Sequence, residues 1–527
     1  MLTFERHPSE YRHWRLEVEP PVATLTLDVD PAGGAIGDYE LKLNTYDIGV
    51  DIELADAVRR IRFEHPEVGS VVLRSGMSGT FCAGANIRML AGATHQHKVN
   101  FCKFTNETRL EMEEASARSG LRFLAAVNGA CSGGGYELAL ACDHILLIDD
   151  RSSAISLPEV PLLGVLPGTG GLTRITDKRH VRRDRADVFA TRAEGIRGEE
   201  ARAGGLVDEL APPSGFEDTV RSRAEALAAT SDRDAAAEPV PLPPLRHRYV
   251  SAEPQRTTRS VRICVTAAAD ADWPLEAARE LDDLLCRIRF NEPDAATLVL
   301  TTRGQTDDVL LHDDALSDPR GHAQRETTLL WARSLSRLDL TARSIIALVE
   351  PGSCFAGILA ELALAADRTY MLDGVFEDDA EPAPPAELTL TPVNLGPMPM
   401  ANGLSRLESR LWGDAAGVQA ARAAVGKRLL AGEAADLGLV TATPDDLDWQ
   451  DEVRVAIEER ASFSPDALTG MEANHRFCGP ETMATKIFGR LSAWQNWIFV
   501  RPNASGPDGA LRRYGTGSRP DYDRERT

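Results

Sequence analysis

Three consecutive glycines, residues 133–135, stand between two apolar segments, and a glutamate, Glu137, follows them closely. The apolar run 123–127 is typical of a buried strand, and the run after the glycines is typical of a helix. The first N–H groups of a helix have no partner inside it, and glycine lets a ligand approach them. A backbone donor at Gly134 and the Glu137 carboxylate could therefore act together on a carbonyl group. Tight strand–helix packing is the alternative use of these glycines.

A second strand-to-helix junction is predicted over residues 80–88, where small and apolar residues precede a helical pattern. The N–H of Ala85 lies at this junction and would again have no partner within the helix. The sequence thus predicts two unused backbone donors, at Ala85 and Gly134, from distant parts of the chain.

Two further residues are candidates for chemistry. Glu159 lies in an apolar run between Pro158 and Pro161, and acidic residues are rarely buried unless they are paired or functional. Cys102 lies on a predicted helix that follows a loop-like stretch, residues 92–98. A free cysteine is commonly a small buried hydrophobe, so packing and chemistry both remain open for Cys102.

The glycine-rich residues 164–171 match a dinucleotide-binding fingerprint only in part, because Thr173 replaces its last glycine. We interpret them as a turn. A basic run follows at residues 178–185. It is either a solvated helix face or a contact for phosphate.

Composition excludes several classes of protein. The 527 residues carry a formal net charge of −22, which argues against a surface for nucleic acid or anionic membrane. No long apolar run and no signal-peptide pattern occur, and the eight cysteines lack zinc-ligand spacing. We therefore expect a cytoplasmic protein with reduced thiols, no metal, and no nucleic-acid or membrane partner.

The chain repeats itself. Residues 60–75 and 287–302 are identical at seven of sixteen positions, and residues 352–367 echo 129–143 with two glycines lost. Strand and helix patterns alternate in both halves, which predicts an α/β fold built from βαβ units. We expect a catalytic domain over 1–229, a Pro/Ala-rich linker over 230–257, a degenerate copy over 258–450, and a helical C-terminal region over 451–527. The last twenty residues are polar and are expected to be loosely held.

Residues 81–87, 127–143 and 157–171 resemble, in order, the three signature blocks of the crotonase (enoyl-CoA hydratase/isomerase) superfamily. The resemblance implies a spiral ββα fold that binds an acyl-CoA thioester. It implies that the N–H groups of Ala85 and Gly134 polarise the thioester carbonyl, with Glu137 and Glu159 as acid and base in an unassigned order. The residues implied to line the substrate are Lys42, Ala83, Gly84, Gly133 and Gly135. Asn86 departs from the family pattern, since many members have Asp there.

The two-copy layout, together with residues 41–50, 98–108 and the C-terminal tail, is similar to one branch of this superfamily. That branch opens the ring of 2,3-epoxybenzoyl-CoA with water and yields 3,4-dehydroadipyl-CoA semialdehyde and formate. The resemblance implies an aryl-CoA substrate, no metal or redox cofactor, a homodimer, and Cys102 close to the ring. A generic enoyl-CoA hydratase and a non-catalytic crotonase-like binding protein are the alternatives. The first would leave the second copy unexplained, and the second would predict loss of the glutamates or glycines.

Overall fold

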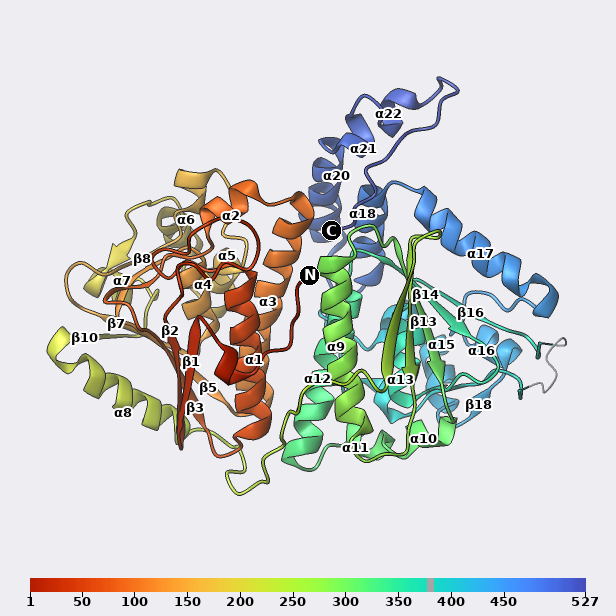
Figure 1. Cartoon of the computed structure of the whole chain (residues 1–527), viewed down its shortest axis with the longest axis horizontal. Helices are drawn as coiled ribbons and strands as arrows, with labels where there is room; N and C mark the ends of the chain where they lie inside the picture. The colour runs from red at the N-terminus through yellow and green to blue at the C-terminus, as the bar shows by residue number, and fades with distance from the viewer. Residues whose placement is uncertain (377–382) are drawn as a thin grey trace. The chain divides into compact units, whose positions relative to one another are not determined.

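The computed structural model describes residues 1–376 and 383–527. The chain forms two compact units (Figure 1). The first unit comprises Leu2–Pro244 and Gly321–Glu326, and the second comprises Met1, Leu245–Arg320 and Thr327–Thr527.

A six-stranded sheet forms the centre of the first unit. Its first two strands are antiparallel, and every later pair is parallel. The middle strands are apolar and buried, as expected where helices cover both faces of a sheet. In spatial order the strands are β1 (Trp14–Glu19), β2 (Val22–Leu27), β3 (Ser70–Ser75), β5 (Arg122–Val127), β7 (His144–Ile148) and β10 (Glu209–Ala211).

Helices cover both faces of this sheet (Figure 1). The helix α8 (Phe216–Ala228) packs its apolar side on β3, β5 and β7. The helices α1 (Ile48–Glu64) and α3 (His95–Arg118) pack on each other and lie on the other face. The start of α3 corrects our expectation of a loop over 92–98. Thr94 accepts a hydrogen bond from the N–H of His97 (3.1 Å) and caps the helix, so helical structure begins at His95.

A second, four-stranded sheet consists of β4 (Gly79–Cys82), β6 (Gly129–Ser132), β8 (Ala154–Ser156) and β9 (Ile196–Arg197). Each of β4, β6 and β8 follows a strand of the larger sheet and leads into a helix, which produces three successive ββα turns. The helical segments after them are α2 (Ile87–Gly92), α4 (Gly134–Ala141) and η2 (Glu159–Leu163). This arrangement is the spiral ββα fold that the family resemblance implies. The remaining helices of the unit are α5 (Gly171–Thr173), η3 (Arg174–Lys178), α6 (Arg183–Ala190) and α7 (Gly198–Ala203).

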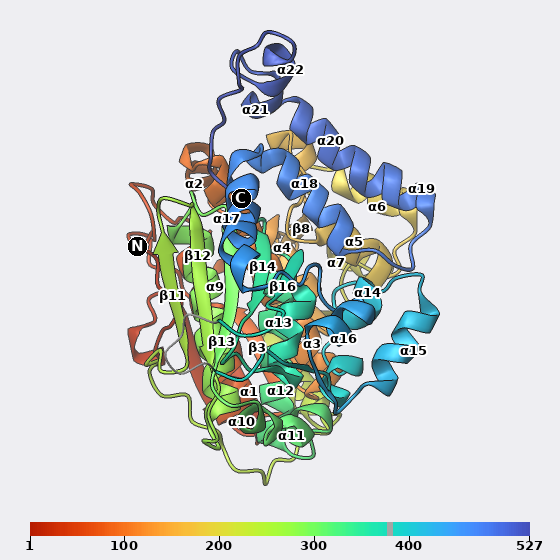
Figure 2. The same cartoon turned by 90° about the vertical axis from the view of Figure 1, so that its right-hand side faces the viewer.

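The second unit repeats the strand order of the first, with one antiparallel pair followed by parallel pairs. The helix α17 (Asp446–Ser462) buries Trp449 and Val453 against its sheet (Figure 2). The strands are β11 (Val250–Gln255), β12 (Ser260–Thr266), β13 (Thr297–Arg303), β14 (Ser344–Val349) and β16 (Arg368–Met371), with a small sheet of β15 (Phe355–Ala356), β17 (Leu388–Thr389) and β18 (Arg428–Leu429). Its helices include α9 (Trp273–Asn291), α12 (His322–Asp339) from Thr327 on, α13 (Gly357–Ala365), α14 (Arg406–Arg410), α15 (Ala415–Ala423) and α16 (Ala431–Asp436).

The C-terminal region is helical as expected, with α18 (Pro465–Arg476) and α20 (Ser492–Phe499) as its longest helices after α17. The expectation of a loosely held tail is wrong for its last residues. Arg526 is buried, and its guanidinium binds Glu472 (2.9 Å) and the carbonyl oxygen of Ala342 (2.6 Å). A charged side chain needs a partner when it is buried, and Glu472 supplies that partner.

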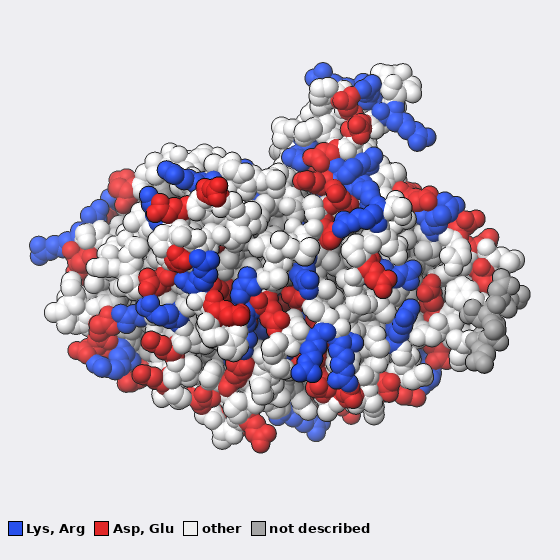
Figure 3. Space-filling view, in the orientation of Figure 1, with Lys and Arg blue, Asp and Glu red and all other residues white. Residues whose placement is uncertain are grey.

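Charged side chains of both signs are interspersed on the face shown in Figure 3. No helix among the described residues has the length and apolar character needed to cross a bilayer.

Candidate active site

The two predicted oxyanion donors come from segments that touch each other. A Cβ atom added to Gly84 would lie 2.8 Å from the backbone nitrogen of Gly134, the first residue of α4. Gly84 also has a φ of +85°, which favours glycine. The structure therefore needs glycine at position 84, and it brings Ala85, the next residue, close to the start of α4.

The N–H of Ala85 takes no part in the β-bridge that Ala85 forms with Tyr46. The backbone of Tyr46 accepts from Asn86 (2.9 Å) and donates to the carbonyl oxygen of Gly84 (3.0 Å). Neither bond uses the N–H of Ala85. The N–H of Gly134 opens α4 and has no partner within the helix. Both donors are thus positioned by main-chain structure, as the sequence predicts.

Asn86, the departure from the family pattern, has a structural role. Its side-chain oxygen accepts from the N–H of Met89 (2.9 Å) and caps α2, while its amide nitrogen donates to Glu40 (2.9 Å) and Thr45 (3.1 Å). An aspartate could form the cap but could not donate the other two bonds.

Glu137 is buried, and the hydrogen bonds to its carboxylate from the described residues all come from neutral donors. Its carboxylate accepts from the N–H groups of Thr169 (3.0 Å) and Gly171 (2.7 Å) and from the Thr169 hydroxyl. Residues 168–170 form the turn that we expected. The turn holds a glutamate in place, so the partial dinucleotide fingerprint reflects this structural use.

Glu159 begins η2, and its carboxyl group lies against the glycine cluster. A Cβ atom on Gly133 would lie 2.7 Å from its Oε1 atom. The Oε2 atom is buried and has no hydrogen-bond partner among the described residues. Burial and, to a lesser extent, the charge of Glu137 raise the pKa of Glu159 to about 7. The site thus contains two carboxyl groups in different environments.

Tyr46 is a site residue that the sequence did not single out. A Cβ atom on Gly134 would clash with the Tyr46 hydroxyl oxygen, so this hydroxyl packs on the first residue of α4. The oxygen is buried without a hydrogen-bond partner among the described residues, and burial raises the pKa of Tyr46 well above its usual value. The ring lies 5.8 Å from that of Phe101 and 5.4 Å from the Arg109 guanidinium. Thr169 was likewise missed, because a threonine in a glycine-rich turn has no distinctive pattern.

Cys102 lies on α3 beside the turn that holds Glu137. A Cβ atom on Gly168 would lie 3.7 Å from its sulfur, and Asn106 bridges the carbonyl oxygens of Cys102 (2.9 Å) and Gly168 (3.0 Å). Burial and the charge of Glu137 raise the pKa of the Cys102 thiol to about 11. The thiol is therefore protonated at neutral pH.

We expect Cys102→Ala to change kcat by less than about tenfold, because a protonated thiol is a poor nucleophile. Steady-state kinetics of the variant with intact fold check this. A loss of several orders of magnitude would show that the thiol itself takes part in the reaction.

The other predicted binding residues differ in their surroundings. Gly135 packs against the carbonyl oxygen of Cys82, and the N–H of Ala83 donates to Leu43 (3.1 Å). Lys42 is exposed and pairs with Glu40 (2.9 Å). In the basic run, Lys178 pairs with Glu113 (2.9 Å). Among the described residues, Lys42 takes no part in the contacts that join Gly84, Gly134 and the two glutamates.

The second unit uses the counterpart of Glu137 differently. Glu361 on α13 is buried and binds Arg406 (3.0 Å) and Asn394 (2.7 Å). In the first unit the equivalent arginine, Arg174, instead binds Glu113 (2.9 Å). An ion pair thus neutralises Glu361, whereas no ion pair of Glu137 occurs within residues 1–376 and 383–527.

Sequence comparison places the chain in a family. The model of the enoyl-CoA hydratase/isomerase family matches residues 40–238. A protein named benzoyl-CoA-dihydrodiol lyase, from Aromatoleum evansii, is 52% identical over 547 aligned residues, which cover 99% of this chain and 97% of that protein. The chain belongs to the enoyl-CoA hydratase/isomerase (crotonase) family. It is an enzyme, and its crotonase-like α/β fold confirms the prediction from sequence.

Other similarities cover part of the chain. The fatty acid oxidation complex subunit alpha of Idiomarina loihiensis is 30% identical over 207 residues, 39% of this chain and 27% of that protein. An enoyl-CoA hydratase structure from Geobacillus kaustophilus is 32% identical, with a TM-score of 0.37, and covers 42% of this chain and 77% of that one. Within residues 1–376 and 383–527, no group of three or more His, Cys, Asp or Glu side chains could hold a metal ion.

Proposed function

We propose that this enzyme is a ring-cleaving lyase that converts 2,3-epoxybenzoyl-CoA to 3,4-dehydroadipyl-CoA semialdehyde and formate. The similarity over nearly the full length to a protein named benzoyl-CoA-dihydrodiol lyase supports an aryl-CoA substrate. The observation that carries the proposal is the Glu159 carboxyl group, which has an unpartnered Oε2 atom and lies against the glycine cluster at the start of α4.

The chemistry begins at the thioester. The N–H groups of Ala85 and Gly134 would bind the thioester oxygen and stabilise the negative charge that develops on it. A polarised thioester withdraws electrons from the attached ring and assists attack by water. The same stabilisation assists the later cleavage of a carbon–carbon bond, because electrons released by that bond can be delocalised toward the thioester.

The environments of the two glutamates suggest their roles. Glu137 accepts three hydrogen bonds and donates none, so it is suited to act as the ionised base that orients and activates water. Glu159 has a pKa raised to about 7 and retains a proton at neutral pH in a substantial fraction of molecules. We therefore assign Glu159 as the acid that protonates the epoxide oxygen as the ring opens.

The reaction balances with water alone. The epoxidised substrate and two water molecules together contain all atoms of the semialdehyde thioester and formic acid. No electrons enter or leave. The balance requires no redox cofactor, and we propose that no metal takes part either, with CoA present only as part of the substrate.

Exposed apolar side chains support a homodimer as part of the proposal. In the second unit, Met483, Phe488 and Val500 are 73%, 76% and 77% exposed. The helical segments that carry or adjoin these residues contact one another, and exposed large apolar side chains that lie close together are typical of protein–protein contacts. Light scattering should give a mass near twice the chain mass of 57.2 kDa, and a mass near 57.2 kDa would contradict the dimer.

The assignment of Glu159 as acid predicts the pH dependence. As pH rises through about 7, Glu159 loses its proton, so kcat/KM should fall on the alkaline side. The measurement is kcat/KM as a function of pH from about 5.5 to about 9, a range that extends at least about one pH unit to each side of that pKa. A rise through the same range would reverse the roles of the two glutamates.

Mass spectrometry of the purified protein with 2,3-epoxybenzoyl-CoA tests the function directly. We expect formate and a ring-opened semialdehyde thioester. Crotonyl-CoA in a parallel reaction tests the alternative. Hydration of crotonyl-CoA with the epoxide unchanged would indicate a generic hydratase, and turnover of neither would contradict the proposal.

A further inference from the structure

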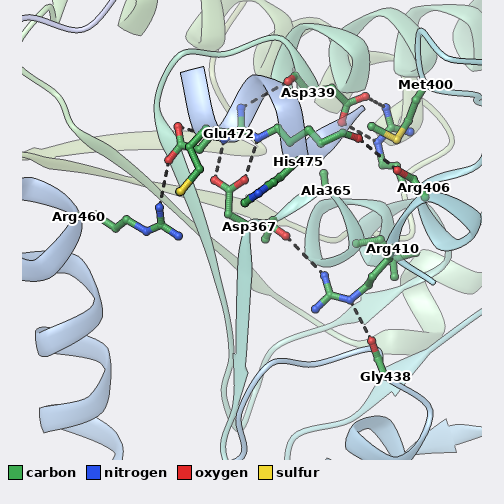
Figure 4. A pocket seen from close by; sticks show the side chains of 15 residues that line it. Asp339, Ala365, Asp367, Met400, Arg406, Arg410, Gly438, Arg460, Glu472 and His475 are labelled. Carbon is green, nitrogen blue, oxygen red and sulfur yellow. Dashed lines mark hydrogen bonds and ion pairs between the residues drawn. The ribbon is translucent and has the colours of Figure 1, made fainter. Parts of the chain in front are cut away.

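The second unit contains a cavity of about 390 Å³ between α13, α14 and α18. Its walls are strongly charged: four arginines line it together with three carboxylates (Figure 4). The cavity lies at the C-terminal end of α13, where Ala365 and Ala366 line it. Its volume falls within the range of small-molecule sites.

Three of the four arginines have carboxylate partners. Arg406 binds both oxygens of Asp339 (3.1 and 2.6 Å). Arg476 binds both oxygens of Asp367 (2.8 and 2.6 Å). Arg460 lies 3.5 Å from Glu472. These ion pairs form the charged wall of the cavity, and in each of them a neighbouring carboxylate offsets the charge of the arginine.

Arg410 is the exception. Its guanidinium donates to the carbonyl oxygens of Gly438 (3.0 Å) and Ala366 (3.5 Å), and both partners are neutral (Figure 4). No ion pair of Arg410 is found among the described residues. Burial alone lowers the pKa of Arg410 to about 10, with no carboxylate to offset it. A mostly buried cation without a counter-charge is costly.

In the first unit, a carboxylate balances the positive charge of the residue that corresponds to Arg410. Lys178 stands four residues after Arg174, as Arg410 stands four residues after Arg406. Lys178 also contacts the end of α4, through the carbonyl oxygen of Ala141 (2.9 Å), but it pairs with Glu113 as well (2.9 Å).

The carboxylates that bind Arg174 and Arg406 explain the difference. Glu113 binds both Arg174 and Lys178. The shorter Asp339 directs both oxygens to Arg406 and has no bond to Arg410. The first unit therefore supplies an internal carboxylate for this cation, and the second unit leaves the cation facing a cavity.

We propose that the cavity is an anion site in which Arg410 binds a small oxyanion, either a carboxylate or a phosphate. A guanidinium presents parallel N–H donors that match two oxygens of such a group. The bound anion would supply the counter-charge that Asp339 does not. This site involves none of the residues assigned to the thioester chemistry, and it gives the degenerate unit a binding role.

Calorimetric titration of the full-length protein at low ionic strength tests the proposal, with inorganic phosphate and acetate as separate probes. We expect saturable binding of at least one of them. Arg410→Met should weaken it at least about tenfold, and Arg410→Lys should weaken it less, because charge is kept but the paired donors are lost. Arg454→Met, at an exposed arginine paired with Asp451 and Glu458 on α17, is the matched control and should bind as the wild type does.

Binding of phosphate alone or of acetate alone would each support the site and assign its chemistry. Absence of binding of both probes, or unchanged binding in Arg410→Met, would overturn the proposal. If Arg410→Met does not fold, crystals of the unmodified protein soaked in selenate decide the matter. An anomalous peak within hydrogen-bond distance of Arg410 supports the site, and no peak there overturns it.

Discussion

Replacing Glu159 by glutamine is expected to lower kcat/KM by about 10²- to 10⁴-fold, the usual contribution of a general acid or base. The amide has nearly the same shape as the carboxyl group but cannot release a proton to the opening epoxide. The Oε2 atom has no hydrogen-bond partner among the described residues, so little structure depends on it. Kinetics with 2,3-epoxybenzoyl-CoA, together with thermal unfolding, check the result.

The unfolding measurement separates chemistry from stability. The raised pKa of Glu159 means that the folded state disfavours its ionised form, so the glutamine variant should be at least as stable as the wild type above pH 7. Glu199→Gln is the control, since Glu199 is exposed on α7 and pairs with Arg202. An active Glu159→Gln variant would remove this residue from the mechanism.

Replacing Gly134 by alanine is expected to lower kcat by about 10²- to 10³-fold, the usual cost of losing one oxyanion donor. A Cβ atom at this position clashes with the hydroxyl of Tyr46. Tyr46 lies in a buried position between Phe101 and Arg109, so it cannot move freely. The start of α4 must shift instead, and the N–H of residue 134 shifts with it.

The matched control is Gly432→Ala on α16, where a Cβ atom would meet nothing within 4 Å. This change should leave kcat unaltered and raise stability slightly, because alanine favours helix. In the double variant Tyr46→Ala/Gly134→Ala the clash is relieved, so part of the lost activity should return. Full activity of Gly134→Ala alone would exclude the N–H of residue 134 from the oxyanion hole.

The local pattern of the sequence was sufficient to locate the glycine junctions and both glutamates. Gly84 and Gly133 adopt positive φ angles, a property of the local backbone that favours glycine. Such requirements act over a few residues and therefore leave a visible signature. Glu159 was visible for a related reason, since a charge in an apolar run is unusual.

Contacts between distant segments were not visible. Tyr46 reaches Gly134, and Thr169 holds Glu137, through packing that no short pattern encodes. The tail gave the wrong expectation for the same reason. Its composition is polar, yet Arg526 is buried because Glu472, 54 residues earlier, lies where it can pair.

By itself the sequence determined the α/β class and the duplication and singled out Glu137 and Glu159 as candidates, because periodicity, glycine clusters and a charge in an apolar run are local properties of the chain. Only the tertiary structure decided whether each buried carboxylate lies beside neutral donors or beside a cation. Glu137 and Glu361 occupy equivalent positions, but the first meets neutral donors and the second meets Arg406. The energy of a buried charge depends on its neighbours within a few ångströms, and those neighbours come from segments that only folding brings together.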